Sequence, residues 1–433
     1  MCNEIDQDNE LKRFAQQAID AEGDHDDPKP NQTTQLVRLA DQAELWHTPN
    51  DEEYASVPVD GHIENWPIKS HRFSQWLRRQ YFERHDQTPN AFALKGAQEQ
   101  LGARAQFVGN EHPVFLRMAK QDGAMYLDLG NEHWECVRMA GNGWSIISDP
   151  PVKFRRPGGM RPLPTPSSGG QIDDLRPFVN VQTDDDWVMV MAWLLGAFMS
   201  PGPYPIIILH GEQGSAKSTS EKVLQRLCDP NGAELRSLPR NVHELMLAAN
   251  NSACLAFDNV SYLPPWLSDA FCRTATGGGF STRRLYTDDE EVLFNVQKPI
   301  MLNGIDDIAN RGDLLDRAIV VHLPAIAEEN RRPESEFWEE FDAYVPRILG
   351  ALFDIVSSAI NNLDTVKMDG VPRMADFAKW VSAAESALGW PTGRFLEVYT
   401  RNRRTSNELP LDASLVAQAI MNAKGNFTNW SGT

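Results

Sequence analysis

The stretch "IILHGEQGSAKSTSEKVLQRL", residues 207–227, passes through three local patterns. It begins with apolar, mostly β-branched residues, which are typical of a buried strand in a parallel sheet. A glycine-containing loop follows, and then a segment whose apolar residues Val223, Leu224 and Leu227 have helical spacing. The order of strand, loop and helix predicts an α/β layer structure with a mainly parallel sheet.

The loop of this stretch has the composition of a phosphate-binding turn. Gly211 and Gly214 permit a tight turn, so that backbone N–H groups and the start of the following helix face an anion. We expect Lys217 to contact the β- and γ-phosphates of ATP and Ser218 to bind Mg²⁺. The alternative is a chance glycine-rich turn. The predicted ATP-binding residues are Gly211, Glu212, Gln213, Gly214, Ser215, Ala216, Lys217, Ser218 and Thr219.

One position of the loop departs from the common phosphate-binding pattern. Ala216 stands where that pattern has a second glycine. Only a positive φ demands glycine, so the alanine costs little if this position has a helical φ. We therefore expect Ala216 to be compatible with phosphate binding.

A second apolar run, "ACLAFDNV" at residues 253–260, predicts a neighbouring strand that ends in an acid. Asp258 would bind Mg²⁺ together with Ser218, because phosphate-binding loops work with a second acidic residue. Asn259 follows, where many ATPases have a glutamate base. Either Asp258 or an acid from elsewhere activates water, or Asn259 only positions the water and turnover is slow. The alternative is that Asp258 is a helix cap or turn former.

The segment "KPIMLNGIDDIANRGDLLDRAIVVHLP" predicts two further strands joined by a helix. The first strand ends in Asn303, whose amide is well placed to hold water near a γ-phosphate. Arg317 opens the second strand and suits an arginine finger inserted into the ATP of a neighbouring subunit. The alternatives are an asparagine in a turn and an arginine in a salt bridge with Asp313 or Asp316.

Residues 184–324 resemble the AAA+ ATPases of the superfamily 3 helicase type, particularly the helicase part of phage and poxvirus primase-helicases. By this resemblance "GEQGSAKS" is similar to Walker A, "LAFDN" to Walker B and Asn303 to sensor 1. Arg317 is similar to the arginine finger, with Arg311 as a second candidate. The resemblance implies an AAA+-like P-loop NTPase core with ATP and Mg²⁺ as cofactors. The implied catalytic residues are Asp258, Asn259, Asn303, Arg317 and Arg311.

The segment "FSTRRLYTDDEEVLFNV" alternates apolar and polar residues around an acidic turn, which predicts a β-hairpin. It is similar to the hairpin that these helicases use to contact DNA. The resemblance implies that Arg283, Arg284 and Tyr286 point into the central channel of a ring. Guanidinium groups beside an aromatic ring can hold single-stranded DNA by phosphate contact and stacking. The alternative is an exposed hairpin whose arginines pair with its own acidic residues.

Pattern and composition also predict the domain organisation. Residues 33–100 combine helical patterns with a strand-like alternation in "YASVPVDGHIENWPI". Short alternating runs over 103–156, beginning with "ARAQFV", predict an antiparallel meander. The stretch "RRPGGMRPLPTPSSGG", residues 155–170, indicates the strongest domain boundary. In similar proteins we expect a small winged-helix domain to begin about where this chain ends. The predicted segments are a polar tail at 1–32, an α+β domain at 33–160, a linker at 161–183, an ATPase domain at 184–330 and a helical region at 331–433.

Composition limits the classes of function. The chain has 433 residues and a formal net charge of −19 at pH 7, so any contact with nucleic acid is expected to be local. Its most apolar segment, residues 187–199, is about 13 residues long, shorter than the roughly 20 that cross a bilayer, and predicts a buried helix. There is no secretory signal pattern and no CxxC pair. We expect a cytoplasmic protein without membrane contact or a zinc site.

Three hypotheses for function follow. The first is an ATP-driven motor that acts on single-stranded DNA in phage-type or plasmid-type replication, working as a homo-oligomer such as a hexameric ring. The second is a nucleotide-dependent switch with slow hydrolysis, which Asn259 favours. The third is a P-loop kinase for a small metabolite, which the lack of an arginine-rich lid in the sequence disfavours.

Overall fold

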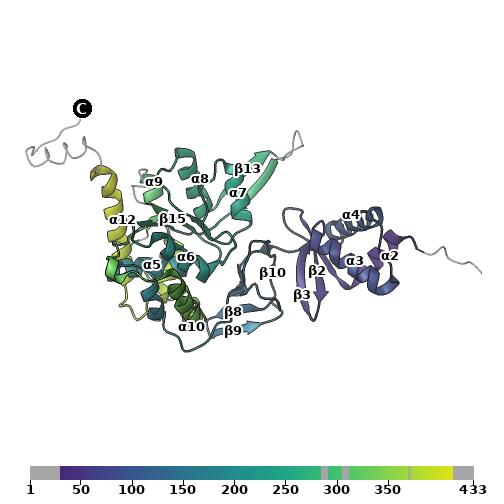
Figure 1. Cartoon of the computed structure of the whole chain (residues 1–433), viewed down its shortest axis with the longest axis horizontal. Helices are drawn as coiled ribbons and strands as arrows, with labels where there is room; N and C mark the ends of the chain where they lie inside the picture. Colours follow the sequence, from purple (N-terminus) through teal and green to yellow (C-terminus); the bar gives the residue numbers. More distant parts are fainter. Residues whose placement is uncertain (1–29, 284–290, 305–311, 369, 371, 413–433) are drawn as a thin grey trace, which may run out of the picture. The chain divides into compact units, whose positions relative to one another are not determined.

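The structure is a computed structural model that describes residues 30–283, 291–304, 312–368, 370 and 372–412 (Figure 1). Its contacts divide the chain into two compact units, Met1–His112 and Pro113–Thr433. Each unit is a mixed α/β structure with its own sheets and its own apolar core. The predicted tail at 1–32 lies outside the described residues except for its last positions.

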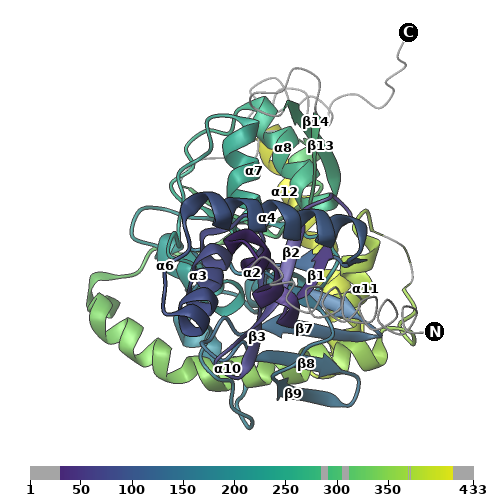
Figure 2. The ribbon, with the colours of Figure 1, turned by 90° about the vertical axis from the view of Figure 1, so that its right-hand side faces the viewer.

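The first unit packs helices against a small sheet with the strand order β3-β2-β1-β4. Its strands pair antiparallel, except that β1 and β4 are parallel. The helices lie beside the sheet (Figure 2). The described elements are α2 (Gln32–Leu39), η1 (Ala40–Gln42), β1 (Glu44–His47), β2 (Glu53–Val59), β3 (His62–Pro67), α3 (His71–His85), α4 (Ala91–Phe107) and β4 (Asn110–Glu111).

One predicted strand of this unit is wrong. The run "ARAQFV" begins inside helix α4, which continues to Phe107. Ala97, Leu101 and Ala105 are all buried at intervals of four residues, so the helical spacing carries on through the run. Alanine, arginine and glutamine are also good helix formers, and this preference outweighs a short apparent alternation.

The second unit begins with an antiparallel meander, as the sequence predicts. The strand order is β6-β7-β8-β9, while β5 and β10 form a separate parallel pair. Trp144 of β9 packs on helix α10 (Glu334–Asn362), where its indole N–H donates to Asp354 Oδ1 at 3.0 Å. The division after His112 therefore cuts through the predicted domain at 33–160. The strands are β5 (Val114–Phe115), β6 (Met118–Gln121), β7 (Ala124–Asp128), β8 (Cys136–Ala140), β9 (Gly143–Ile147) and β10 (Lys153–Phe154).

The proline- and glycine-rich stretch that predicted a boundary packs closely on helix α10. A Cβ atom on Gly170 would lie 2.2 Å from the backbone oxygen of Arg347. A Cβ atom on Gly350 would lie 1.9 Å from the backbone oxygen of Ser167. These glycines allow two backbones to cross at close range, so the contacts divide the chain at His112 and not at this stretch.

A parallel sheet with the strand order β12-β15-β11-β16 follows in the same unit. Helix α9 (Gly312–Leu315) precedes its last strand, and an antiparallel hairpin precedes β15. Helix η2 (Ile172–Phe178) and helix α5 (Asp184–Ala197) lead into the sheet. The strands and the hairpin arms are β11 (Ile206–His210), β12 (Leu255–Phe257), β13 (Gly278–Arg283), β14 (Glu291–Val296), β15 (Ile300–Gly304) and β16 (Ala318–His322).

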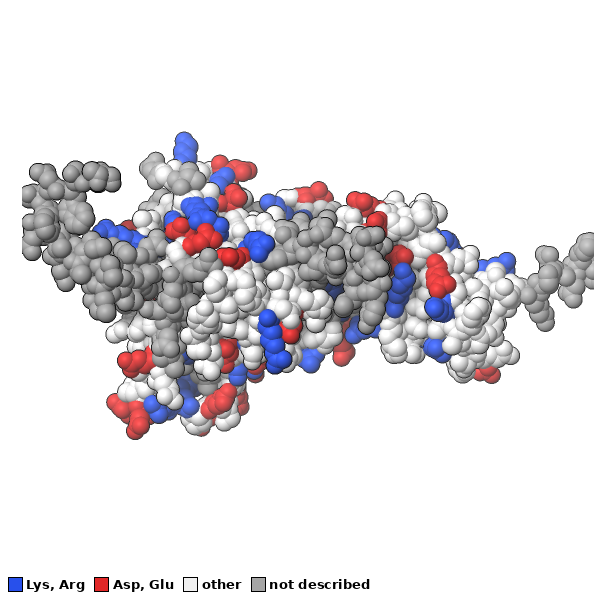
Figure 3. All heavy atoms as spheres, turned by 90° about the horizontal axis from the view of Figure 1, so that it is seen from above, with Lys and Arg blue, Asp and Glu red and all other residues white. Residues whose placement is uncertain are grey.

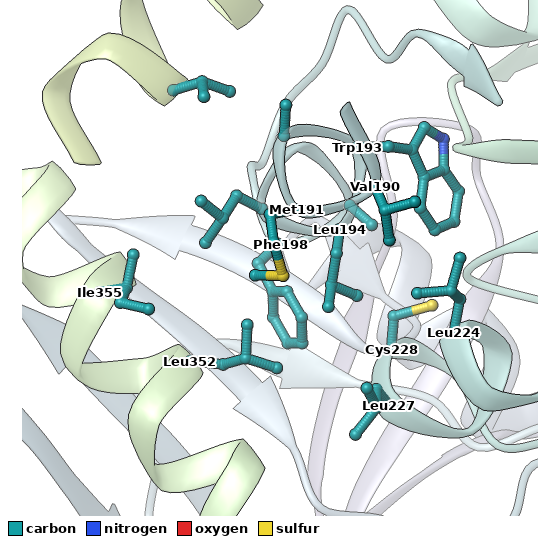
Figure 4. Close-up of a cluster of buried hydrophobic side chains, with 14 of the residues drawn as sticks. Val190, Met191, Trp193, Leu194, Phe198, Leu224, Leu227, Cys228, Leu352 and Ile355 are labelled. Atoms are coloured by element: carbon teal, nitrogen blue, oxygen red, sulfur yellow. The ribbon is translucent and has the colours of Figure 1, made fainter. Parts of the chain in front are cut away.

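Helices cover both faces of this sheet. Successive residues of β11 point to opposite faces, and each set packs in a different core. Ile207 and Leu209 share a core with α5, α6 (Lys217–Cys228) and α10. Ile206 and Ile208 share another core with α7 (Val242–Asn250) and α8 (Pro265–Thr276). The buried helix predicted at 187–199 is α5, and this prediction is confirmed. Figure 4 shows its side chains beside those of α6 and α10, among them Val190, Met191, Leu194, Leu224, Leu227, Leu352 and Ile355.

The end of the described chain is helical, as predicted. Helix α10 is followed by α11 (Ala375–Ala384) and α12 (Arg394–Asp412), and the short helix η3 (Glu328–Asn330) precedes it. By length and composition alone α10 could cross a membrane, but 61% of its apolar window is buried inside the protein. A core helix of a globular unit has the same properties, so α10 is weak evidence for a membrane span.

Candidate nucleotide site

The glycine-rich loop lies at the carboxyl end of β11 and leads into α6. Gly211 is required there, because a Cβ atom would lie 2.3 Å from the backbone oxygen of Leu323. Gly214 has a φ of 82°, which favours glycine. Ser215 is buried, and its hydroxyl donates to the backbone oxygen of Glu212 at 2.8 Å. The loop therefore has a fixed shape, with Glu212, Gln213 and Gly214 exposed at its tip.

Ala216 does not have the helical φ on which its predicted low cost depended. Its φ is 57° and its ψ is 32°, which places it in the left-handed region immediately before α6. The chain has to reverse here to enter the helix, and a Cβ atom in this conformation costs about 1–2 kcal/mol. Compatibility with the turn is thus retained at a cost in backbone strain, which the sequence expectation did not include.

The side chain of Lys217 lies across the loop. Its ammonium donates to the backbone oxygens of Gly211 and Glu212, at 2.7 Å in each case. Burial lowers the pKa of Lys217, and the nearby charge of Asp258 works in the opposite direction. A lysine held over a loop of this kind can exchange the carbonyl contacts for phosphate oxygens. Thr219, one turn into the helix, is partly buried.

Ser218 and Asp258 meet although they lie on different elements. The Ser218 hydroxyl donates to Asp258 Oδ1 at 2.8 Å, which joins the start of α6 to the end of β12. A hydroxyl and a carboxylate are oxygen donors of the kind that Mg²⁺ takes from a protein when phosphates and waters complete its shell. The pair therefore fits the predicted Mg²⁺ site. No cluster of three or more His, Cys, Asp or Glu side chains suited to a metal occurs among the described residues.

Asn259 and Asn303 also meet, but the Asn303 side chain is directed inward. Asn259 has a φ of 56°, and its backbone N–H donates to Asn303 Oδ1 at 3.0 Å. Asn303 is 1% exposed, and its Nδ2 donates to Glu221 Oε2. Both ends of the Asn303 amide are thus engaged inside the protein. Its predicted role of holding water near a phosphate stays a prediction that would need these contacts to change.

Glu221 is a residue of this site that the sequence argument missed. It lies one turn after Ser218 on α6 and is fully buried. Burial raises the pKa of Glu221 to about 8, while the hydrogen bond from Asn303 works in the opposite direction. A signal was present, because Glu221 shares the apolar stripe of α6 with Leu224. An acid on such a stripe needs a partner inside the fold.

Asn180 is a second residue that the sequence argument missed. Its Nδ2 donates to the backbone oxygen of Ser215 at 2.9 Å and to that of Pro324 at 2.7 Å. The side chain thereby ties the glycine-rich loop to the segment after β16. Nothing in the local sequence marks Asn180, because its partners are distant along the chain.

Arg317 is engaged in an ion pair within the chain. Its guanidinium donates to the backbone oxygen of Asp313 at 2.8 Å and also pairs with the Asp313 carboxylate. The hydrogen bond from Arg317 lowers the pKa of Asp313. Arg373 contacts Asp313 and Asp316 at 3.1 and 3.0 Å. This is the salt-bridge alternative of the sequence analysis, and a finger role would require the pair to open. Arg311 lies outside the described residues.

The predicted hairpin is present as the antiparallel pair β13 and β14. Figure 1 labels its first arm, β13, and Arg283 stands opposite Glu291 at the last described register position. Arg284 and Tyr286 lie outside the described residues. On the face shown in Figure 3, basic and acidic side chains of the described residues are interspersed.

Fold and site define a mixed α/β protein in which a glycine-rich loop, a lysine and a Ser–Asp pair meet at one edge of a parallel sheet. The model of the family described as actinomycete integrative conjugative element replication protein matches residues 172–402, which is more than half of the chain. The chain belongs to this family. No curated protein matches it by sequence.

The solved structures similar to this chain include one described as a C-terminal region and one described as an active helicase. The apo structure of the NrS-1 C-terminal region has a TM-score of 0.43 and 12% identity, covering 82% of this chain and 72% of that one. A structure titled as SCCmec type IV Cch, active helicase, has a TM-score of 0.43 and 10% identity, covering 90% of this chain and 79% of that one.

Proposed function

We propose that the second unit is an ATP-hydrolysing motor of the AAA+ superfamily 3 helicase type, which acts on single-stranded DNA during replication of an integrative conjugative element. The observation that carries the proposal is the hydrogen bond between Ser218 and Asp258 beside the glycine-rich loop. It brings the two expected Mg²⁺ ligands together from elements 40 residues apart in sequence. Membership of a replication protein family supports the setting.

The roles of Lys217, Ser218 and Asp258 follow from the positions of their side chains, and the other roles are those expected from the sequence. Lys217 and the loop amides bind the phosphates, and the start of α6 adds the positive end of its dipole. Ser218 and Asp258 would hold Mg²⁺, which would supply positive charge against the phosphates during phosphoryl transfer. Arg283, Arg284 and Tyr286 contact the DNA strand. Arg317 or Arg311 completes the site of a neighbouring subunit.

An ATPase assay with and without single-stranded DNA tests the motor. Wild-type protein should hydrolyse ATP faster when DNA is present, and Lys217→Ala should abolish hydrolysis. Lys222→Ala is the matched control, because it removes the same charge from the same helix, away from the loop. Joint replacement of Arg283 and Arg284 by alanine should reduce the stimulation by DNA and leave basal hydrolysis. A rate of ATP hydrolysis that is the same with and without single-stranded DNA would contradict the motor.

A mixing experiment tests the oligomer and the role of Arg317. Lys217→Ala and Arg317→Ala subunits should each be inactive alone. If Arg317 acts on the neighbour, a mixture of the two should regain part of the activity, because the Lys217→Ala subunit supplies the arginine. If Arg317 only pairs with Asp313, the mixture stays inactive. Light scattering with a non-hydrolysable ATP analogue measures the ring, and a strict monomer would contradict it.

The second candidate is a nucleotide-dependent switch with slow hydrolysis. Asn259 favours it, because an amide cannot take a proton from the attacking water as a carboxylate does. In this case ATP should bind with Mg²⁺ and change the assembly state, while turnover stays low whether or not DNA is present. Phosphoryl transfer to a small acceptor would instead support the less favoured P-loop kinase.

A further inference from the structure

Three groups behind the Ser218–Asp258 pair form a chain of hydrogen bonds. Glu221 Oε2 accepts from Asn303 Nδ2, and Asn303 Oδ1 accepts from the backbone N–H of Asn259 at 3.0 Å. The backbone oxygen of Asn303 also accepts from the N–H of Val260 at 2.8 Å. Asn303 therefore holds the two residues that follow Asp258, and Glu221 holds Asn303.

The chemistry of these groups fixes the direction of the chain. A carboxamide has a donor end and an acceptor end, whereas a backbone N–H only donates. The Asn259 N–H therefore takes the oxygen of the Asn303 amide, and Glu221 Oε2 accepts from the amino end that remains. With an apolar residue at 221, the amino end would lose its acceptor and the amide would be held at one end only.

The turn at Asn259 bears directly on Asp258. Asn259 is left-handed, with a φ of 56°, and it comes immediately after the residue whose carboxylate contacts Ser218. A shift of this turn would move the Asp258 carboxylate relative to Ser218. The contact from Asn303 is thus the support that sets the spacing of the two oxygen donors.

Burying the carboxyl group of Glu221 lowers the free energy of unfolding, which indicates that the residue has a function at this position. It is 0% exposed, and an apolar side chain of similar volume would avoid the cost of removing a carboxyl group from water. We propose that Glu221 is a positioning residue of the nucleotide site, which orients the Asn303 carboxamide and through it fixes Asp258 opposite Ser218. The inference rests on the proposed function for its catalytic consequence, but its structural consequence can be measured separately.

The test compares Glu221→Met, Glu221→Gln and Gln225→Met. The two methionine variants remove the polar end of neighbouring buried side chains on α6, and Gln225 donates to the backbone oxygen of Asp229, one turn further from the glycine-rich loop. Removing a supporting residue of a metal site costs about 10- to 100-fold in activity. Glu221→Met should lower kcat by this factor while the KM for ATP changes little. Glu221→Gln should retain most of kcat, because its amide oxygen still accepts from Asn303, and Gln225→Met should match wild type.

Hydrogen exchange of the backbone separates this inference from the proposed function. Peptides that contain the Asn259 amide should exchange faster in Glu221→Met than in wild type or Gln225→Met, whether or not the protein hydrolyses ATP. Unchanged exchange and unchanged kcat in Glu221→Met would overturn the inference and leave the ATPase standing. If Glu221→Met does not fold, Glu221→Asp takes its place in the test, because the shorter side chain cannot reach Asn303. A fully active Glu221→Asp protein with wild-type exchange would overturn the inference as well.

Discussion

Two turns at the carboxyl edge of the parallel sheet differ in how their left-handed residues are supported. Ala216 and Asn259 have nearly the same φ, 57° and 56°. Asparagine tolerates this conformation, and the N–H of Asn259 is held by Asn303, which Glu221 holds in turn. Alanine has no polar group to offset the strain. The turn at Asn259 is therefore stabilised by hydrogen bonds in its left-handed conformation, whereas the turn at Ala216 stores strain beside the predicted phosphate site.

The largest expected effect concerns Glu221, the buried acid that supports the turn at Asn259 through Asn303. Burial raises the pKa of Glu221 from its ordinary value of 4.5 to about 8, with Asp258 and Cys254 as neighbouring groups. Because this pKa is raised in the folded state, the contribution of Glu221 to the free energy of unfolding is fully present below pH 4.5. It is lost as the pH rises through about 8. The loss is on the order of 4–5 kcal/mol. Urea unfolding at several pH values should show this slope, and Glu221→Gln should flatten it.

The next effect is expected from removing the link between acid and turn. Asn303→Ala removes the buried hydrogen bonds that Asn303 makes with Glu221 and with the Asn259 N–H, which should lower the free energy of unfolding by about 3 kcal/mol. The control is Asn361→Ala on the exposed side of α10, with an expected change within about 0.5 kcal/mol. Equal effects of the two variants would show that the Asn259 turn is not supported from below.

Replacing the left-handed asparagine gives a smaller effect. Asn259→Ala should destabilise the protein by about 1 kcal/mol, because the alanine would have the strain that Ala216 already has. Asn259→Gly should cost less, since glycine adopts this φ freely. Chemical unfolding of the two variants measures the difference, and a glycine variant less stable than the alanine variant would contradict the account.

The smallest expected effect is a gain at the strained turn. Ala216→Gly should raise the free energy of unfolding by about 0.5–1 kcal/mol, because glycine relieves the left-handed alanine and loses part of the gain to chain entropy. Ala248→Gly, inside α7, is the matched control and should cost about 1 kcal/mol. A destabilised Ala216→Gly protein would show that the loop is not strained.

Much of the fold could be predicted from local patterns. The glycines around Gly211, the apolar run before them and the amphipathic helix after them are all readable within one stretch of sequence. The meander, the buried helix α5 and the C-terminal helices follow from periodicity as well. The run "ARAQFV", predicted as a strand, and the stretch 155–170, predicted as a boundary, are short patterns that each have two physical explanations. A glycine-rich stretch can separate domains or can let backbones cross closely.

The candidate site could be predicted only in part. Ser218 and Asp258 were expected to meet, and they do. Asn303 and Arg317 were expected to face a nucleotide, but in the structure their polar groups pair with residues of the same chain. The ATP, Mg²⁺ and DNA assignments stay predictions. Side-chain direction depends on what lies opposite, and a single sequence does not carry that information.

The sequence by itself determined the order of strand, loop and helix, the acid at the end of the second strand and the hairpin that precedes β15, because each depends on neighbours in the chain. The tertiary structure alone decided that Ala216 is left-handed, that Asn180 ties the loop to the segment after β16, and that Glu221 supports Asn259 through Asn303. The last two features join residues far apart in sequence, whose approach is set by the packing of α6 against the sheet.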